Sequence, residues 1–123
     1  MPVGTGGTIA GVINGVSESR TIIGFPALKG ATFLEDEIRK YTLKKNWQLV
    51  YDYHFGGYAK VTNELLEFMN EFEKEFNIPL DPIYTSKMMF GIMDLIQKKF
   101  FESGFTILAI HTGGLQGRAG FNS

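Results

Sequence analysis

The sequence predicts an α/β fold in which a mostly parallel sheet lies between two layers of helices, giving three layers in all. Two observations lead to this class. Amphipathic segments with helical spacing alternate with short apolar runs that have the length of buried strands. The connections between these segments are short, and several contain glycine. We expect residues 1–123 to form one such domain, because a chain of this length buries a single core.

The first two elements are expected to be a helix and a strand. The helix begins near Thr8, after a glycine-rich turn, and ends near Val16, and the sequence shows no strand in front of this turn. Phosphate-binding turns normally follow a strand, so we expect the chain to be the C-terminal part of a larger protein. The apolar run at 21–25 predicts a short buried strand, which Pro26 ends.

The next helix and strand are indicated by a capping pattern and by composition. Thr32 and Glu35 have the spacing of a capping box, which predicts that a helix begins after Thr32. Residues 47–53 are rich in aromatic and aliphatic side chains, which predicts a strand that leads into a glycine-rich loop.

Two long helices and a final strand are expected in the rest of the chain. Residues 65–76 carry apolar side chains at helical spacing on one face and charged side chains on the other. After two prolines, a second helix is expected over 86–101. The apolar run at 106–110 predicts the last strand. The predicted order is therefore helix, strand, helix, strand, helix, helix, strand.

Composition and charge exclude several classes of function. The 44% hydrophobic content is that of a packed globular protein, and the net charge of −1 gives no basic surface for nucleic acid or a membrane. The chain has no cysteine, and His54 and His111 have no regularly spaced carboxylate or histidine partner, so we expect no metal site. The first residues do not form a signal peptide and no apolar run is long enough to span a membrane, so a cytoplasmic protein is expected.

Three loops are expected to line one crevice: Gly4–Thr8, His54–Tyr58 and Thr112–Gly114. In open α/β sheets, ligands bind beyond the carboxyl ends of the strands, which is where these loops are expected. A glycine turn that leads into a helix directs several backbone N–H groups and the positive end of the helix dipole toward an anion. Phosphate is therefore the expected ligand of Gly4–Thr8. For a glycine cluster taken alone, a tight turn that binds nothing is the alternative.

Four segments together resemble one known family. Val3–Gly11 looks like the cofactor-phosphate loop of pyridoxal-phosphate enzymes of the tryptophan-synthase-β fold, which is fold type II. Leu80–Lys87 and Ile110–Gly114 are similar to the closing segments of the 1-aminocyclopropane-1-carboxylate deaminase / D-cysteine desulfhydrase group. Gly56-Gly57-Tyr58 stands where that group has a glycine-tyrosine loop. The segments follow in the order and spacing of the family and cover essentially the whole chain.

The resemblance implies a cofactor, pyridoxal 5'-phosphate, and residues that hold it. The phosphate is expected to bind to the backbone N–H groups, and to a threonine hydroxyl, of Thr5, Gly6, Gly7 and Thr8.

The resemblance also implies the residues around the cofactor ring and the substrate. Thr112, with Thr85 as the alternative, is expected to face the pyridine nitrogen. Tyr58 and Tyr84 are expected to flank a small amino-acid substrate, where they position it or transfer protons. For each tyrosine taken alone, a packed ring with its hydroxyl in water is the alternative.

One residue that such enzymes need has no match in this sequence. The lysine that forms the Schiff base with the cofactor belongs to an N-terminal segment of these enzymes, and Lys87 and Lys60 do not match its position. Without that lysine no base removes the Cα proton of the substrate. The chain is therefore expected to be inactive alone.

Two threonines indicate which branch of the group the chain resembles. The cyclopropane deaminases have a glutamate and a leucine where this sequence has Thr85 and Thr112. A neutral hydroxyl leaves the pyridine nitrogen unprotonated, which suffices when a good leaving group such as thiolate departs from Cβ. The resemblance therefore implies β-elimination from a D-cysteine-like substrate in the intact protein.

A second class of function stays open beside the enzyme. Eleven phenylalanines, and a sheet whose neighbouring elements lie outside this sequence, favour exposed apolar surface. Such surface drives self-association, so we expect a homo-oligomer. The alternative to a cofactor-binding part of an enzyme is a non-catalytic, self-associating module without a cofactor.

Overall fold

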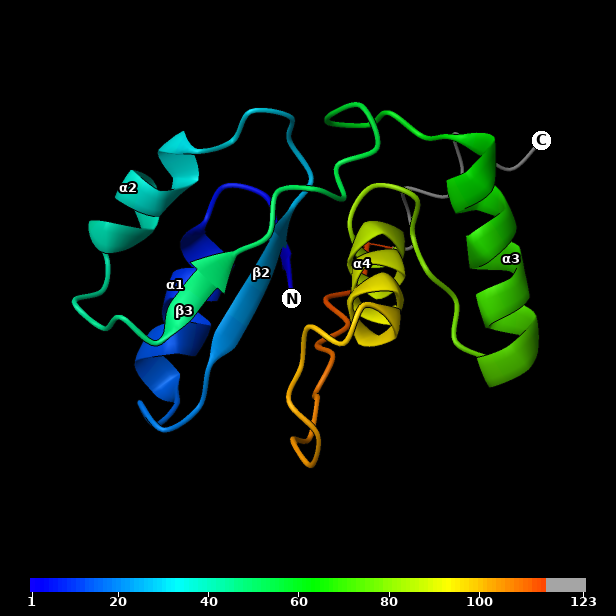
Figure 1. Cartoon of the computed structure of the whole chain (residues 1–123). Helices are drawn as coiled ribbons and strands as arrows, with labels where there is room; N and C mark the ends of the chain where they lie inside the picture. Colours follow the sequence, from blue (N-terminus) through cyan, green and yellow to red (C-terminus); the bar gives the residue numbers. More distant parts are fainter. Residues whose placement is uncertain (115–123) are drawn as a thin grey trace.

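The computed structural model describes residues 1–114. Within them a parallel sheet has the strand order β1-β2-β3. Its elements, in chain order, are β1 (Pro2–Val3), α1 (Gly7–Gly15), β2 (Ile22–Pro26), α2 (Phe33–Arg39), β3 (Trp47–Leu49), α3 (Asn63–Phe76) and α4 (Thr85–Gln97). Figure 1 shows α1 and α2 on one side of the sheet, α4 on the other side, and α3 outside α4. The predicted α/β fold, with a parallel sheet between helices, is confirmed.

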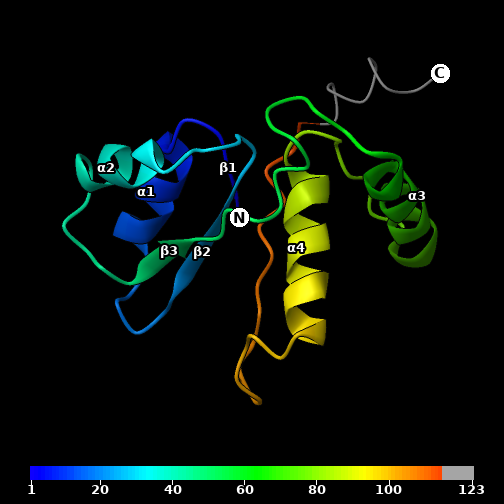
Figure 2. The ribbon, with the colours of Figure 1, turned by 45° about the horizontal axis from the view of Figure 1, so that its top comes forward.

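The central strand β2 shows why helices cover both faces of the sheet. Successive residues of a strand point to opposite faces. Ile22 packs into a core cluster with residues of α1 and α2, whereas Phe25 packs with Met88 and Ile92 of α4. The turned view in Figure 2 shows the same layers. Gly91 allows the close approach of α4, because a Cβ there would lie 2.7 Å from the Phe25 ring.

One strand is present that the sequence analysis did not predict. β1 pairs in parallel with β2: Phe25 N–H donates to the Met1 carbonyl at 2.9 Å, and Ala27 N–H donates to the Val3 carbonyl at 3.1 Å. The glycine-rich turn therefore does follow a strand. Two residues are too few to show the alternating pattern by which a strand is recognised in a sequence.

The predicted strand at 106–110 is wrong, and the strand predicted at 47–53 is shorter in the structure. Residues 105–114 form no strand, and Phe105 and Leu108 are 70% and 83% exposed. The adjacent edge strand, β1, has only two residues and offers few backbone groups to pair with.

β3 ends at Leu49, because its neighbour β2 ends at Pro26, which has no N–H to donate.

The predicted capping box at α2 does not form. Thr32 has helical backbone angles (φ −61°, ψ −24°), and its side chain makes no capping hydrogen bond. A capping side chain needs an extended backbone at its own residue. Thr62 at the start of α3 meets this condition (φ −101°, ψ 160°), and its hydroxyl accepts a hydrogen bond from Leu65 N–H at 3.2 Å.

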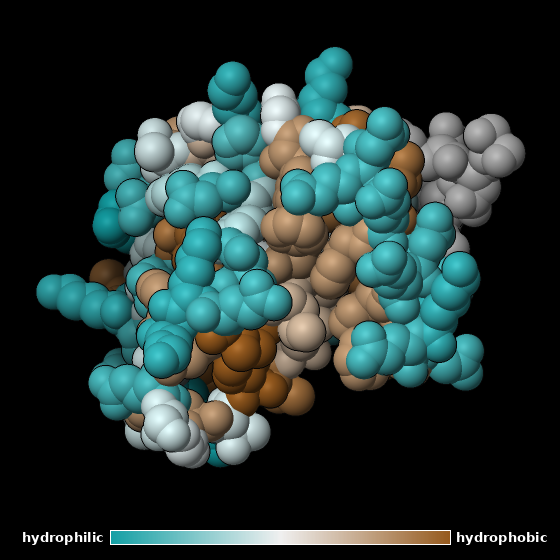
Figure 3. Space-filling view, turned by 45° about the vertical axis from the view of Figure 1, so that its right-hand side comes forward, coloured by the Kyte–Doolittle hydropathy of each residue, from teal (hydrophilic) through white to brown (hydrophobic). Residues whose placement is uncertain are grey.

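Apolar side chains also reach the surface. Figure 3 shows brown, hydrophobic surface below the centre of this face, between teal polar side chains. A second apolar region is hollow: a cavity of about 600 Å³ lies between β2, Ile92 of α4 and residues 100–110. In residues 1–114 no helix combines the length and the hydropathy that crossing a membrane requires.

Candidate phosphate-binding site

A cavity of about 370 Å³ lies where β1 leads into α1. Its wall is formed by residues 2–6, by Thr8 and Ile9, by Tyr84 ahead of α4, and by residues 112–114. The structure thus brings together two of the three loops that were expected to share a crevice, Gly4–Thr8 and Thr112–Gly114. The third loop, His54–Tyr58, does not line the cavity and reaches it through a ring contact with Tyr84.

The start of α1 presents backbone donors to this cavity. The first α-helical hydrogen bond runs from Ala10 N–H to the Gly6 carbonyl at 3.1 Å, so the N–H groups of Gly7, Thr8 and Ile9 have no acceptor within the helix. No side chain caps this end, and its first turn contains no acidic residue. Unpaired donors and the positive end of the helix dipole favour an anion here.

Two glycines shape the loop in different ways. A Cβ at Gly4 would lie 3.4 Å from the Tyr84 hydroxyl, so this glycine allows the tyrosine to pack on the loop. Gly6 has φ +95°, a conformation that residues with a Cβ rarely adopt, and its Cβ would face Ile38 in the core. Gly6 therefore sets the direction of the loop, whereas Gly4 sets the distance to Tyr84.

Tyr84 connects the cavity to the glycine-rich loop at 54–60. Its ring centroid lies 6.1 Å from that of Tyr58, which is 53% exposed. Burial of Tyr84, and next the neighbouring Tyr58 hydroxyl, raise the pKa of Tyr84 to about 12. The Tyr84 hydroxyl is therefore protonated at neutral pH and suits the role of a hydrogen-bond donor better than that of a base.

The two threonines expected near a pyridine nitrogen have different surroundings. Thr112 lines the cavity beside Gly113 and Gly114. Thr85 is fully buried, and its hydroxyl donates to Asp81 Oδ2 at 2.5 Å and accepts from Asp81 N–H at 2.8 Å. The side chain of Thr85 is thus engaged at the start of α4.

Asp81 is a residue whose role the sequence analysis missed. Its buried carboxylate accepts hydrogen bonds from the backbone N–H groups of Ile83, Tyr84 and Thr85, at 2.9, 2.7 and 2.9 Å. It thereby caps α4 and fixes the backbone of Tyr84 beside the cavity. An aspartate a few residues before an apolar helical pattern is the available sequence signal.

His111 has a local structural role. Its Nδ1 accepts a hydrogen bond from Gly113 N–H at 3.1 Å, so Nε2 carries the proton of the neutral ring and donates to the Pro79 carbonyl at 2.8 Å. Both contacts hold the turn at 112–114 against the segment before α4. Within residues 1–114, no group of three histidine, aspartate or glutamate side chains is arranged to bind a metal ion.

The residues that line the cavity in the described part of the chain are uncharged: the wall consists of apolar residues, glycines, Thr5, Thr8, Thr112 and Tyr84. Positive potential at this site therefore comes from backbone N–H groups and not from lysine or arginine.

Several known proteins are similar to this chain. A Pyrococcus furiosus protein described as "Putative 1-aminocyclopropane-1-carboxylate deaminase" is 38% identical over 130 residues, which cover 95% of this chain and 39% of that protein. A Thermotoga maritima protein with the same description is 32% identical over 129 residues, which cover 94% of this chain and 40% of that protein. A comparison with protein-family models finds no match.

A solved structure agrees with these sequence matches. The structure described as "Crystal Structure Analysis of the ACC deaminase homologue" superposes with a TM-score of 0.83 at 32% identity, over 95% of this chain and 39% of that chain. This chain therefore spans about two fifths of the length of the proteins that it matches. These matches confirm the resemblance inferred from the sequence motifs. Over that part of their length, the chain is related to the 1-aminocyclopropane-1-carboxylate deaminase family.

Proposed function

We propose that Gly4–Thr8 binds the phosphate group of pyridoxal 5'-phosphate, and that the chain forms this part of the cofactor site in a protein acting on a small amino acid. The observation that carries the proposal is the uncapped start of α1, which opens on a cavity of about 370 Å³. The donor set fits a phosphate, because several N–H groups converge there and no acidic side chain opposes an anion. The relationship to the deaminase family supports the identity of the cofactor.

Each residue of the site has a distinct task in this proposal. Bound pyridoxal phosphate supplies the electron sink that stabilises negative charge on the amino-acid Cα. The hydroxyl groups of Thr5 and Thr8 supplement the backbone donors on the phosphate. Thr112 presents a neutral hydroxyl to the cofactor ring. Tyr84, with its raised pKa, donates a hydrogen bond to the substrate and stays protonated.

The uncharged wall favours β-elimination over ring opening. No carboxylate lines the cavity in the described residues, so no anionic partner keeps a pyridine nitrogen protonated. An unprotonated ring is a weaker electron sink and suits a substrate with a good leaving group on Cβ, such as D-cysteine. Because the Thr85 hydroxyl is engaged by Asp81, Thr112 carries this role in the proposal.

No lysine lines the cavity among residues 1–114. The chain by itself is therefore expected to bind the cofactor reversibly, without a covalent bond. A phosphorylated probe that cannot react with lysine is then the appropriate test ligand, and pyridoxamine 5'-phosphate meets this need because it has no aldehyde.

The test compares pyridoxamine 5'-phosphate with pyridoxamine by isothermal titration calorimetry and by amide chemical shifts. We expect the phosphorylated probe to bind at least tenfold more tightly and to shift the amides of the first turn of α1. Thr8→Val removes one hydroxyl from the site and should weaken only the phosphorylated probe. Equal affinity for the two probes would refute the phosphate site.

We also propose that the chain self-associates through the apolar cavity between β2, Ile92 of α4 and residues 100–110. Phe105 and Leu108 beside it are largely exposed, and surface of this kind is normally covered. Light scattering is expected to show a dimer or a larger assembly that Leu108→Asp dissociates. Leu43→Asp is the matched control, because Leu43 is 95% exposed and does not line this cavity. A monomeric wild type at high concentration would refute this proposal.

A further inference from the structure

The loop at 54–60 has an unusual backbone conformation. Phe55, Gly56, Gly57 and Ala59 all have positive φ, with values of 55°, 101°, 125° and 59°. Positive φ at residues with a Cβ is costly, so contacts from elsewhere must support this conformation. Tyr58, the residue that contacts Tyr84, lies inside this run.

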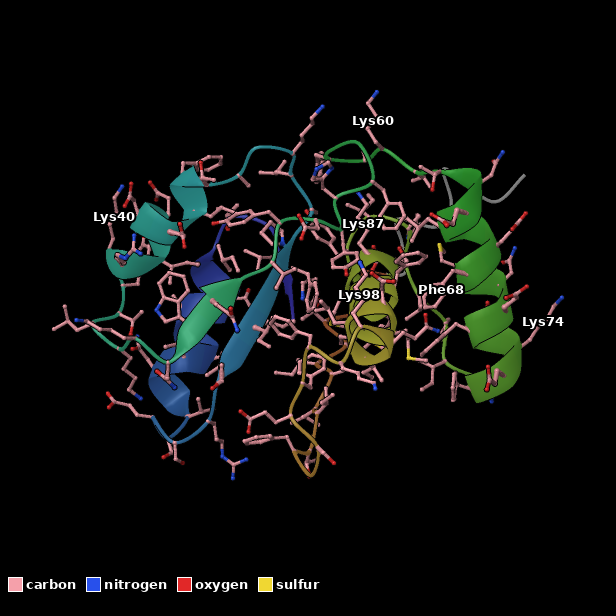
Figure 4. The ribbon with its side chains drawn as sticks, viewed as in Figure 1. Lys40, Lys60, Phe68, Lys74, Lys87 and Lys98 are labelled. Carbon is pink, nitrogen blue, oxygen red and sulfur yellow. The ribbon has the colours of Figure 1, made fainter. Side chains whose placement is uncertain are left out.

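Two contacts connect the loop to α4. At one end, the Phe55 ring meets the Phe90 ring edge-on, with centroids 4.9 Å apart. Next to Tyr58, Lys87 Nζ donates to the Gly57 carbonyl at 2.9 Å. Figure 4 shows Lys87 at the top of α4, below this loop, whereas Lys60 on the same loop points away from the molecule.

Burying Lys87 to bind the Gly57 carbonyl lowers the stability of the fold. The residue is only 1% exposed, and in residues 1–114 its ammonium group makes a single hydrogen bond, to one neutral carbonyl. A buried charge with one neutral partner costs more than an apolar side chain of similar volume. Burial lowers the pKa of Lys87 to about 8, which reflects that cost, and the buried Asp81 carboxylate opposes this shift.

We infer that Lys87 is a positioning residue whose bond to the Gly57 carbonyl holds Tyr58 against Tyr84 beside the cavity. The hydrogen bond fixes the geometry of the Tyr58–Tyr84 pair but lowers the stability of the fold. Asp81 acts on the other partner of the pair, because it binds the backbone N–H of Tyr84. Two oppositely charged residues, Asp81 before α4 and Lys87 in its first turn, thus fix the two tyrosines. That the pair then positions an amino-acid substrate rests on the proposed function.

The test uses Lys87→Met, which keeps the length and volume of the side chain but cannot bind the carbonyl. Lys60→Met is the matched control, because Lys60 lies on the same loop and is exposed. We expect Lys87→Met to melt at or above the wild-type temperature and to lose the nuclear Overhauser contacts between the rings of Tyr58 and Tyr84. The control should keep both properties. Persistence of these ring contacts in folded Lys87→Met would overturn the inference.

Two further measurements keep the outcome decisive. If methionine at position 87 prevents folding, Lys87→Gln replaces it, because glutamine is too short to reach the Gly57 carbonyl and must lose the same ring contacts. Inorganic phosphate is titrated into each variant, and its affinity should be unchanged, since Lys87 does not line the cavity. Absence of phosphate binding in every variant would refute the proposed function and leave the positioning role to be judged by the ring contacts alone.

Discussion

The starts of α1 and α4 lie beside the same cavity but are completed in opposite ways. At α4, the Asp81 carboxylate accepts three backbone N–H groups and the Thr85 hydroxyl. At α1, Gly6 occupies the cap position and no side chain accepts the N–H groups of the first turn. The dipole of α4 is therefore neutralised from within the chain, whereas that of α1 remains available to a ligand.

The difference shows how one fold separates stability from binding. A buried carboxylate at a helix start stabilises the fold and fixes the neighbouring Tyr84. An uncapped start contributes less to stability but offers several donors to an anion. This contrast leads to four predictions about the two helix starts.

The largest effect is expected at the capped start. Asp81→Ala leaves three N–H groups and the Thr85 hydroxyl without their acceptor and should lower the free energy of unfolding by about 3 kcal/mol. Urea unfolding measures this value. Thr62→Ala, which removes the single side-chain cap of α3, is the comparison and should cost about 1 kcal/mol. Equal losses in the two variants would contradict the dominant role of Asp81.

The second effect concerns the backbone at the uncapped start. Gly6→Ala forces a residue with a Cβ to φ +95° and should cost about 1–2 kcal/mol of stability while displacing the phosphate donors. Gly11→Ala is the control within the same helix, since no atom lies within 4 Å of the added Cβ, and it should stabilise α1 by up to about 1 kcal/mol. Calorimetric titration of pyridoxamine 5'-phosphate should show weaker binding to the first variant alone.

The third prediction makes the start of α1 resemble that of α4. Thr5→Asp places a carboxylate beside the uncapped N–H groups, where it competes with a phosphate and repels it. Affinity for inorganic phosphate should fall roughly fivefold, equivalent to about 1 kcal/mol, and the melting temperature should rise slightly. Thr5→Asn has a similar size without the charge and should bind phosphate more tightly than the aspartate variant. If the two variants bind phosphate equally, the helix dipole does not attract this ligand.

The fourth prediction is a pH dependence of stability that comes from Lys87 in the first turn of α4. The folded pKa of about 8 lies below the ordinary value of 10.5, so between these pH values the unfolded chain binds more protons. This residue therefore makes stability rise as pH increases from 8 to 10.5, and its cost is fully present below pH 8. Melting temperatures of wild type and Lys87→Met should converge over this range. A constant difference between the two melting temperatures would show that the pKa of Lys87 is not lowered in the folded state.

Much of the architecture followed from local patterns. The helical spacing of apolar residues in 65–76 and the apolar run at 21–25 predicted α3 and β2, because these patterns depend on neighbours along the chain. The glycine-rich turn predicted where α1 begins for the same reason. Thr32 shows the limit of this approach: its spacing to Glu35 suits a cap, but its backbone is already helical.

The sequence by itself determined the fold class, the glycine-rich turn and the resemblance to the deaminase family. Only the tertiary structure decided that β1 pairs with β2, that residues 106–110 form no strand, and that Asp81 engages Thr85 beneath Tyr84. The pairing of Lys87 with the Gly57 carbonyl also belongs to this second group, because the two residues are 30 positions apart. The physical reason is that helix periodicity and glycine turns act between near neighbours, whereas strand pairing and the burial of polar groups depend on which distant segments meet.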